Sequence, residues 1–99
     1  MKLRILLEAE QEIAEALDWY EARRPGLGVR YLRAIDAAFE RIVSNPESFP
    51  LWQKKEPYRK CVLLQFPYVL FFRTTPEEIV IAAVAHAKRH PRYWVRRSE

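Results

Sequence analysis

The residues best equipped for chemistry in this sequence lie together near its carboxyl end. Residues 86–94 read His-Ala-Lys-Arg-His-Pro-Arg-Tyr-Trp, which combines two imidazoles, three cations and two aromatic rings. Histidine moves protons near neutral pH, arginine holds phosphate oxygens through parallel hydrogen bonds, and aromatic rings stack on bases. This composition favours a site that handles a phosphodiester or binds nucleic acid. It is also typical of a solvated basic tail whose aromatic residues anchor it against the core.

Two further arginines are candidates because they fall within predicted strands. In residues 59–66 the more apolar alternating set is our choice for the core: Lys60, Val62, Leu64 and Phe66. Arg59 is then expected to point outward, and Arg73 shares its face with apolar neighbours. The alternative is that both are ordinary arginines of a strand surface.

Composition restricts the classes of function. Gly26 and Gly28 are the only glycines, so no glycine-rich phosphate loop is present and we expect no cofactor. Cys61 is the only cysteine, which fits a reducing cytoplasm, and two histidines make a weak case for a metal. No window approaches the roughly 20 apolar residues of a membrane span. The net charge of +4 favours an anionic partner, either nucleic acid or an acidic protein, but also suits an ordinary basic domain.

Hydrophobic periodicity predicts the elements that position these residues. Alternation over residues 2–7 indicates a short strand, and apolar residues then recur at helical spacing in two stripes. The stripes are Ala9, Ile13, Leu17 and Tyr20, then Leu32, Ile35, Phe39 and Ile42. A turn at 24–28 separates the two helices, and the second ends near Ser44 because Pro46 follows. Residues 58–65, 68–74 and 78–86 are rich in β-branched and aromatic residues and are predicted strands.

This order predicts one α+β domain over residues 1–99, with the topology β-α-α-β-β-β. Short connections between the last three strands favour an antiparallel sheet, and the two helices form a hairpin packed on one face. The other face of the sheet is also apolar. We therefore expect that face to be a docking surface for a partner chain.

Four segments resemble the RelE/ParE superfamily of toxins, also called plasmid-stabilisation proteins. They are Trp-Tyr-Glu at 19–21 with Arg-Pro-Gly-Leu-Gly at 24–28, Asn-Pro-Glu-Ser-Phe-Pro at 45–50, Phe-Pro-Tyr at 66–68, and the run at 86–94. Their order and spacing extend the likeness over nearly the whole chain. The resemblance implies the same β-α-α-β-β-β fold, a cytoplasmic location, and a neutralising antitoxin encoded beside the toxin.

The superfamily divides by target, and two departures bear on which branch this chain resembles. One branch cuts messenger RNA on the ribosome, whereas a ParE-like branch poisons DNA gyrase. The nuclease branch typically carries a basic residue after the tyrosine that opens the third strand, but here Val69 follows Tyr68. It often has two cations in the preceding strand, where this chain has Arg59 and Cys61. Both departures favour the ParE-like branch.

Other positions agree with the nuclease branch. Arg89 matches the basic residue after the last strand, and Tyr93 or Trp94 falls near a terminal aromatic. Glu56 is the candidate for a glutamate that some of these nucleases carry before the second strand.

Three hypotheses follow. The first is a toxin that inhibits growth by binding its target, with gyrase favoured. Its expected contact residues, to protein or nucleic acid, are Arg73, Lys88, Arg89 and Arg92. The second is a ribosome-dependent endoribonuclease, in which arginine stabilises charge on phosphorus and histidine moves the proton. Its catalytic residues would be Arg59, His86, Arg89 and Tyr93. The third is a degenerate toxin that only binds its antitoxin.

Two expectations concern the partner and the tail. The antitoxin is expected to be acidic and to lay an extended or helical segment over the toxin. Arg89 is expected to be functional. Trp94 is expected to be structural, folding back on the chain through a turn that Pro91 begins.

Overall fold

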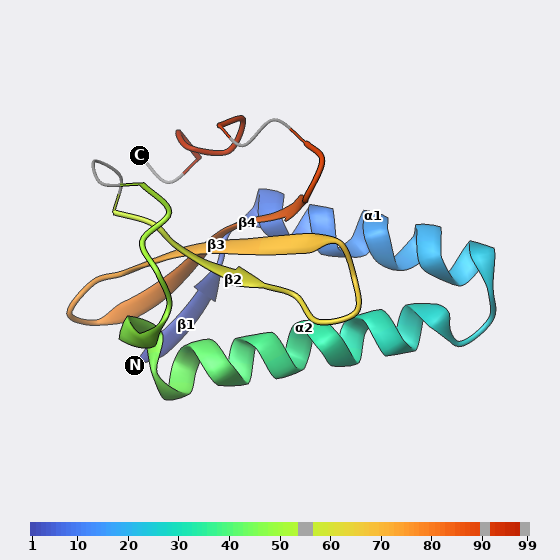
Figure 1. Ribbon diagram of the computed structural model, residues 1–99, viewed down its shortest axis with the longest axis horizontal. Coiled ribbons are helices and arrows are strands. Elements are labelled where there is room, and N and C mark those ends of the chain that lie inside the picture. Colours follow the sequence, from blue (N-terminus) through green and yellow to red (C-terminus); the bar gives the residue numbers. More distant parts are fainter. Residues whose placement is uncertain (54–56, 90–91, 98–99) are drawn as a thin grey trace.

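A computed structural model describes residues 1–53, 57–89 and 92–97. Its elements follow the order β1 (Lys2–Ile5), α1 (Leu7–Arg23), α2 (Leu27–Ser44), a 3-10 turn η1 (Pro46–Ser48), β2 (Arg59–Val62), β3 (Tyr68–Thr74) and β4 (Glu78–His86) (Figure 1). This confirms the β-α-α-β-β-β order, and β3 and β4 have the predicted bounds.

The four strands form one sheet in the order β1-β4-β3-β2. The predicted antiparallel pairing holds for β2 with β3 and for β3 with β4. In contrast, β1 runs parallel to β4, with Lys2 opposite Glu78 and Ile5 opposite Ile81, so the sheet is mixed. The long connection through both helices lets the chain return beside β1 in the same direction, which no short turn could do.

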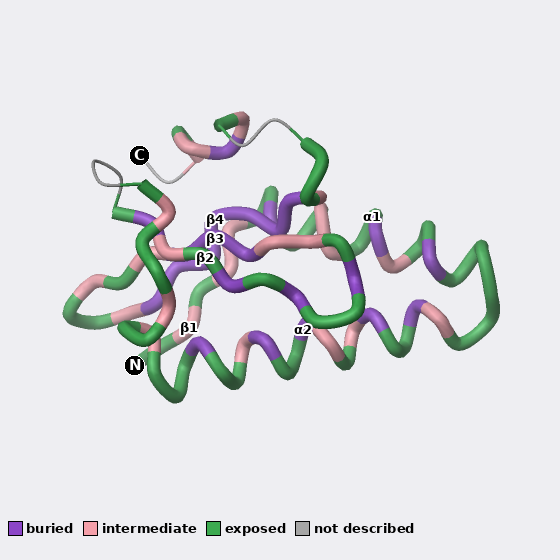
Figure 2. The backbone as a smooth tube through the Cα atoms, viewed as in Figure 1, coloured by how far each residue is buried: buried purple, intermediate pink, exposed green. Residues whose placement is uncertain are grey.

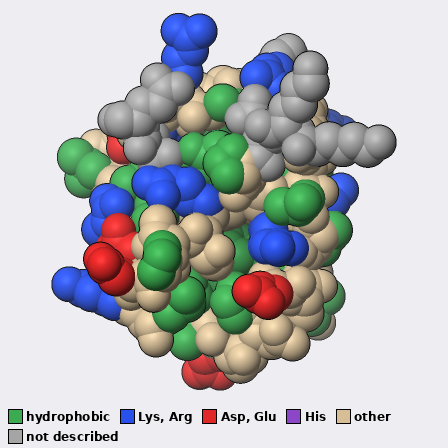
Figure 3. All heavy atoms as spheres, turned by 90° about the vertical axis from the view of Figure 1, so that its left-hand side faces the viewer, with side chains coloured by type: hydrophobic (Ala, Val, Ile, Leu, Met, Phe, Trp, Pro, Cys, Tyr) green, Lys and Arg blue, Asp and Glu red, His purple; other side chains and the backbone are tan. Residues whose placement is uncertain are grey.

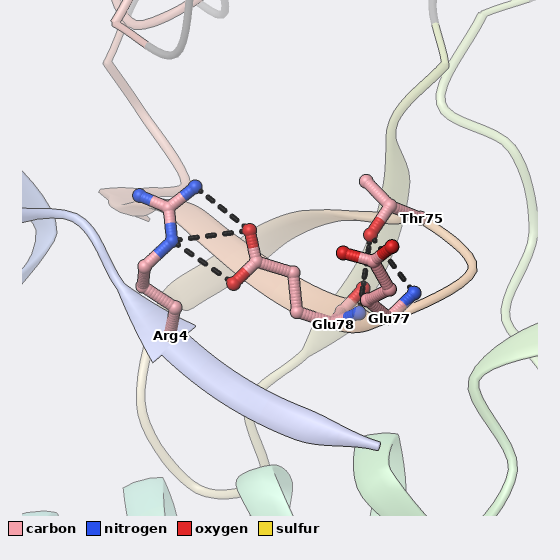
Figure 4. Close-up of polar contacts among 4 residues, drawn as sticks. All are labelled: Arg4, Thr75, Glu77 and Glu78. Atoms are coloured by element: carbon pink, nitrogen blue, oxygen red, sulfur yellow. Dashed lines mark hydrogen bonds and ion pairs between the residues drawn. The ribbon is translucent and has the colours of Figure 1, made fainter.

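Polar contacts secure the edge where β1 meets β4 (Figure 4). The guanidinium of Arg4 donates through Nε and Nη2 to the carboxylate of Glu78, at 3.1 and 3.0 Å. These hydrogen bonds and the charge of Arg4 hold the pKa of Glu78 below its ordinary value. In the β3–β4 turn, Thr75 Oγ1 accepts the backbone N–H groups of Glu77 and Glu78. The contacts fix the register at the start of β4.

A β-bulge at Ala82 changes which residues of β4 face the helices. The register shifts there, since Phe71 lies opposite Ala83 and Phe72 opposite Ile81. Ile81 packs in the core under the helices before the bulge, and Val84 does so after it. The bulge therefore brings His86, two residues beyond Val84, to the side of the sheet that α1 covers.

The helical hairpin covers one face of the sheet and forms the larger core (Figures 1 and 2). Buried helix residues are Ala9, Ala16 and Tyr20 of α1 with Tyr31, Ile35, Ala38 and Ile42 of α2. The remaining stripe residues, Ile13, Leu17, Leu32 and Phe39, are partly buried against the same core. Both predicted helix stripes are confirmed.

The inward and outward sides of β2 are the reverse of those predicted. Cys61 and Leu63 are 1% and 3% exposed, whereas Val62 and Leu64 are 58% and 64% exposed. β2 ends at Val62 and the chain then turns through Gln65, which has a φ of 70°. The prediction was wrong for Val62 and Leu64, because it extended the alternation of a strand into this turn, whereas Phe66 is buried as predicted.

The turn between α1 and α2 depends on Glu21. Its carboxylate accepts the backbone N–H of Gly26 at 3.1 Å and that of Gly28 at 3.0 Å, so it caps the start of α2. Gly26 adopts a φ of 91°, which suits glycine. These residues belong to the first of the four segments that carried the family resemblance, and here they shape the hairpin.

We predict that Glu21→Ala lowers the free energy of unfolding by about 1–2 kcal/mol, because two N–H groups at the start of α2 lose their acceptor. Chemical denaturation of the purified protein measures this change. Glu10→Ala is the matched control, because Glu10 is an exposed glutamate of the same helix. Equal stability of the two variants would contradict the capping role.

Candidate functional site

Three of the predicted site residues meet in a pocket of about 480 Å³ between α1 and the ends of β3 and β4. His86, Arg89 and Tyr93 form one side of it. The remaining lining residues are Glu12, Glu15, Ala16, Trp19 and Tyr20 of α1 with Pro67, Tyr68 and Val84. The sheet end and the helix thus hold the basic segment in a defined place.

His86 is fixed at the end of β4. Its Nδ1 accepts the backbone N–H of Lys88 at 3.1 Å, so the neutral ring carries its proton on Nε2. The ring lies edge-on to Tyr68, with centroids 5.2 Å apart. The backbone carbonyl of His86 accepts the backbone N–H of Arg89 at 3.0 Å, which closes a turn after β4 and fixes the backbone of Arg89 there.

Arg89 lies against the ring of Tyr93. Its guanidinium carbon is 3.7 Å from the ring centroid, a cation–π stack that leaves the N–H groups at the rim available to a ligand. The Tyr93 hydroxyl donates to Glu12 Oε2. Burial, together with the neighbouring Glu12 carboxylate, raises the pKa of Tyr93. Tyr93 is therefore held as a hydrogen-bond donor to Glu12.

Glu12 is a site residue that sequence reasoning missed. Its Oε1 accepts the backbone N–H of Val84 at 3.0 Å and Nη1 of Arg97 at 2.7 Å, in addition to the bond from Tyr93. The side chains of Glu12 and Arg97 are 12% and 16% exposed. A signal was present, because Glu12 lies on the helix stripe between the buried Ala9 and Ala16. A carboxylate in such a stripe needs partners.

Aromatic residues of α1 and β3 form the wall of the pocket, and they too were not predicted as site residues. Tyr20 contacts Tyr68 and Trp19 edge-on, with centroids 6.3 and 5.1 Å apart. Trp19 is 53% exposed and carries the guanidinium of Arg23 4.1 Å from its ring centroid. The pocket therefore presents aromatic surface at its rim.

Arg59 lies away from this pocket. Its guanidinium donates to the backbone carbonyl of Phe49 at 2.7 Å, which ties the segment after η1 to β2. Arg59 is opposite Phe72 in the sheet, four residues along β3 from Tyr68, which is about 13 Å. The expectation that Arg59 points outward fails, because it shares the inward side of β2 with Cys61.

The other predicted contact residues are dispersed. Arg73 lies at the far end of β3, where its charge adds to the larger effect of Arg4 in lowering the pKa of Glu78. That end of the molecule shows cationic and hydrophobic side chains interspersed (Figure 3). Lys88 is exposed beside the pocket. Arg92 donates to Gln53 Oε1 at 3.2 Å and lies 5.7 Å from the Trp52 ring centroid. The candidates Glu56, His90 and Pro91 lie outside the described residues.

The second face of the sheet is covered in its middle by the chain's own tail. Trp94 is fully buried there, stacked on Phe71 with centroids 4.4 Å apart and edge-on to Tyr58 at 4.7 Å. Trp94 is thus buried as its expected structural role requires. The prediction of an open apolar face has to be corrected, because the tail and Trp52 occupy that surface.

No group of three His, Cys, Asp or Glu side chains in ranges 1–53, 57–89 and 92–97 could hold a metal ion. Among the helices in those ranges, none is both long enough and apolar enough to cross a membrane.

The architecture matches that of a solved toxin–antitoxin structure. A chain described as "Chromosomal ParDE TA system from P. aeruginosa" superposes with a TM-score of 0.79 at 17% sequence identity, covering 89% of this chain and 97% of that one. Identity this low shows the shared fold alone.

Sequence comparison identifies the family. The family model described as "ParE toxin of type II toxin-antitoxin system, parDE" matches residues 3–91. "Toxin ParE2" of Mycobacterium tuberculosis, from strains CDC 1551 / Oshkosh and ATCC 25618 / H37Rv, is 35% identical over 92 residues, which cover 91% of this chain and 85% of the relative. The chain belongs to the ParE toxin family, and this membership implies a partner antitoxin.

We predict that Trp94→Ala lowers the free energy of unfolding by about 3–5 kcal/mol, because a buried indole leaves a cavity on the second face of the sheet. Thermal or chemical denaturation measures the loss. Trp19→Ala, at a half-exposed tryptophan, should cost much less. If the two variants lost equal stability, the tail would not be part of the core.

Proposed function

We propose that this ParE-type toxin arrests growth by binding a protein target in the pocket around Arg89, and that the favoured target is DNA gyrase. The observation that carries the proposal is the composition of the pocket. Trp19, Tyr20, Tyr68 and Tyr93 line it with Arg89. Tryptophan, tyrosine and arginine are the residue types that dominate the binding energy of protein interfaces.

The charges of the pocket also favour a protein target. The carboxylate of Glu12 is already paired with Arg97. The other charged residues of the pocket wall are Glu15 and Arg89, and Lys88 is exposed beside the pocket. A nucleic-acid site gains its affinity from a clear excess of cations over anions. With Glu15 opposed by Arg89 and Lys88, the excess is only one positive charge, which suits a mixed polar and aromatic protein surface better.

The endoribonuclease remains the alternative, because His86, Arg89 and Tyr93 lie together. Two observations weigh against it. Arg59, the fourth residue of that catalytic set, is engaged with the carbonyl of Phe49 and lies about 13 Å along the sheet from Tyr68. The hydroxyl of Tyr93 is already engaged as a hydrogen-bond donor to Glu12, so it is not free to contact a phosphate.

Two assays separate the hypotheses. Purified protein is expected to inhibit supercoiling by purified gyrase, and its induction in bacterial cells is expected to cause gyrase-linked DNA breaks. Rapid cleavage of transcripts within translated reading frames, with no effect on gyrase, would replace this proposal with the nuclease. Absence of any growth defect would leave the degenerate toxin.

We predict that Arg89→Ala abolishes growth inhibition while changing the free energy of unfolding by less than about 1 kcal/mol, since Arg89 is exposed. Growth after induction and denaturation of the purified variant measure the two effects. Arg96→Ala is the control, because Arg96 is an exposed arginine of the same tail outside the pocket. Full toxicity of Arg89→Ala would contradict the proposed site.

We place the antitoxin on a second hollow of about 320 Å³, between α2 and the turn after β2. Arg30, Arg33 and Arg41 surround it, and Leu64, 64% exposed, contributes apolar surface. Cations around an apolar floor suit an acidic amphipathic segment. The second face of the sheet is less suitable, since Trp94 covers its middle.

We predict that Arg33→Glu weakens binding of the small protein encoded beside this chain by about tenfold, mainly through slower association at low salt. Binding kinetics measured at two ionic strengths test this. Arg96→Glu makes the same change of charge on the tail and should leave the association rate nearly unchanged. Equal effects of the two variants would point to net charge alone and would remove the hollow as the docking site.

A further inference from the structure

We propose that Glu12 of α1 is the positioning residue of the target-binding site, holding Arg89 in place through the ring of Tyr93. The biological meaning of this inference rests on the function proposed above. Its physical content, that the direction of the Arg89 guanidinium depends on a carboxylate of α1, does not.

Glu12 joins three parts of the molecule at one carboxylate. From α1 it accepts the backbone N–H of Val84 in β4 at 3.0 Å. It also accepts Nη1 and Nη2 of Arg97 at 2.7 and 3.2 Å, and the hydroxyl of Tyr93. Arg97 reaches on to the carbonyl of Ala82 in the bulge, at 3.4 Å. Residues 92–97, drawn in red in Figure 1, are thus hydrogen-bonded to α1 through Tyr93 and Arg97.

The same carboxylate acts on Arg89 through one intermediate. The Tyr93 ring is held at its hydroxyl by Glu12, and its face carries the Arg89 guanidinium at 3.7 Å and that of Arg97 at 5.0 Å. Within the part of the chain that the structure describes, this stack is the side-chain contact that orients Arg89. Without Glu12 the Tyr93 hydroxyl loses this acceptor, and only apolar packing at the edge of the second core and the two cation–π contacts still hold the ring.

The tail has a separate anchor, so positioning and folding can be distinguished. Trp94 holds the backbone on the opposite face of the sheet, against Phe71 and Tyr58. Adjacent residues therefore serve different purposes: Trp94 secures the segment, and Tyr93 directs it toward α1. Loss of the Glu12 carboxylate should release Tyr93 and Arg89 while the tail remains docked.

The experiment compares Glu12→Ala, Glu12→Gln and Tyr93→Phe in the full chain. NMR spectroscopy follows the side-chain protons of Arg89, which the Tyr93 ring shifts upfield relative to the exposed Arg96. We expect this shift to be lost in Glu12→Ala and in Tyr93→Phe, which keeps the ring but not its hydroxyl. We expect partial retention in Glu12→Gln, whose amide oxygen still accepts a hydrogen bond. The dose that inhibits growth should rise about tenfold or more in the first two variants.

Controls separate positioning from a general loss of stability. Glu10→Ala removes an exposed carboxylate from the same helix and should change neither the shift nor the toxic dose. All variants are compared at a temperature where denaturation shows them folded. The double variant Glu12→Ala with Tyr93→Phe should be as toxic as the less toxic of the two single variants. Both changes remove the same hydrogen bond, from the Tyr93 hydroxyl to Glu12.

The outcomes distinguish this inference from the proposed function. An unchanged Arg89 shift in folded Glu12→Ala overturns the positioning role, whatever the toxicity. An unchanged toxic dose despite a lost shift also overturns it, provided that Arg89→Ala is non-toxic in the same cells. If Arg89→Ala is itself toxic, the proposed site fails, and the NMR result alone then decides whether Glu12 orients Arg89.

Discussion

The structure depends on the burial of β4 from both sides. Residues 79–85 are all buried, and β4 lies between β1 and β3 in the centre of the sheet. A strand without an exposed face needs apolar cover on both. The helical hairpin supplies one cover through α1, and the segment with Trp94 supplies the other. Among the described residues it is the basic tail, with Trp94, that packs on this second face, so the tail also serves the core.

This double requirement explains how a tail with many cations becomes ordered. Trp94 buries its indole against Phe71, and the residues beside it are then confined close to the sheet. Arg97 pairs with Glu12 at a largely shielded position, where an ion pair is screened less than at the surface. The cations that remain exposed, such as Arg89, are displayed from a fixed backbone. Order imposed by packing is what separates a binding site from a solvated end.

Local patterns predicted the elements. Apart from the local turn at Gln65, which reversed the predicted sides of β2, the errors came from non-local pairings. The helix stripes and the bounds of β3 and β4 follow from periodicity and from prolines and turns, which act over a few residues. The direction of β1 in the sheet is set by its pairing with β4, which begins at Glu78, far along the chain. No local pattern in the sequence shows this pairing. The bulge at Ala82 is hidden because a strand buried on both faces has no alternation to break. Glu12 was missed because its partner Arg97 lies 85 residues away.

The family resemblance is carried largely by residues that build the fold, and this limits what it says about the target. Glu21 caps α2, and Phe66 packs on Tyr20 with centroids 5.0 Å apart. Any member that keeps this hairpin needs similar residues, whichever process it inhibits. The target must instead be read from positions that the fold leaves free, such as Glu15 and Trp19 at the pocket rim. Trp19 is 53% exposed at this rim, and tryptophan is one of the residue types that dominate the binding energy of protein interfaces.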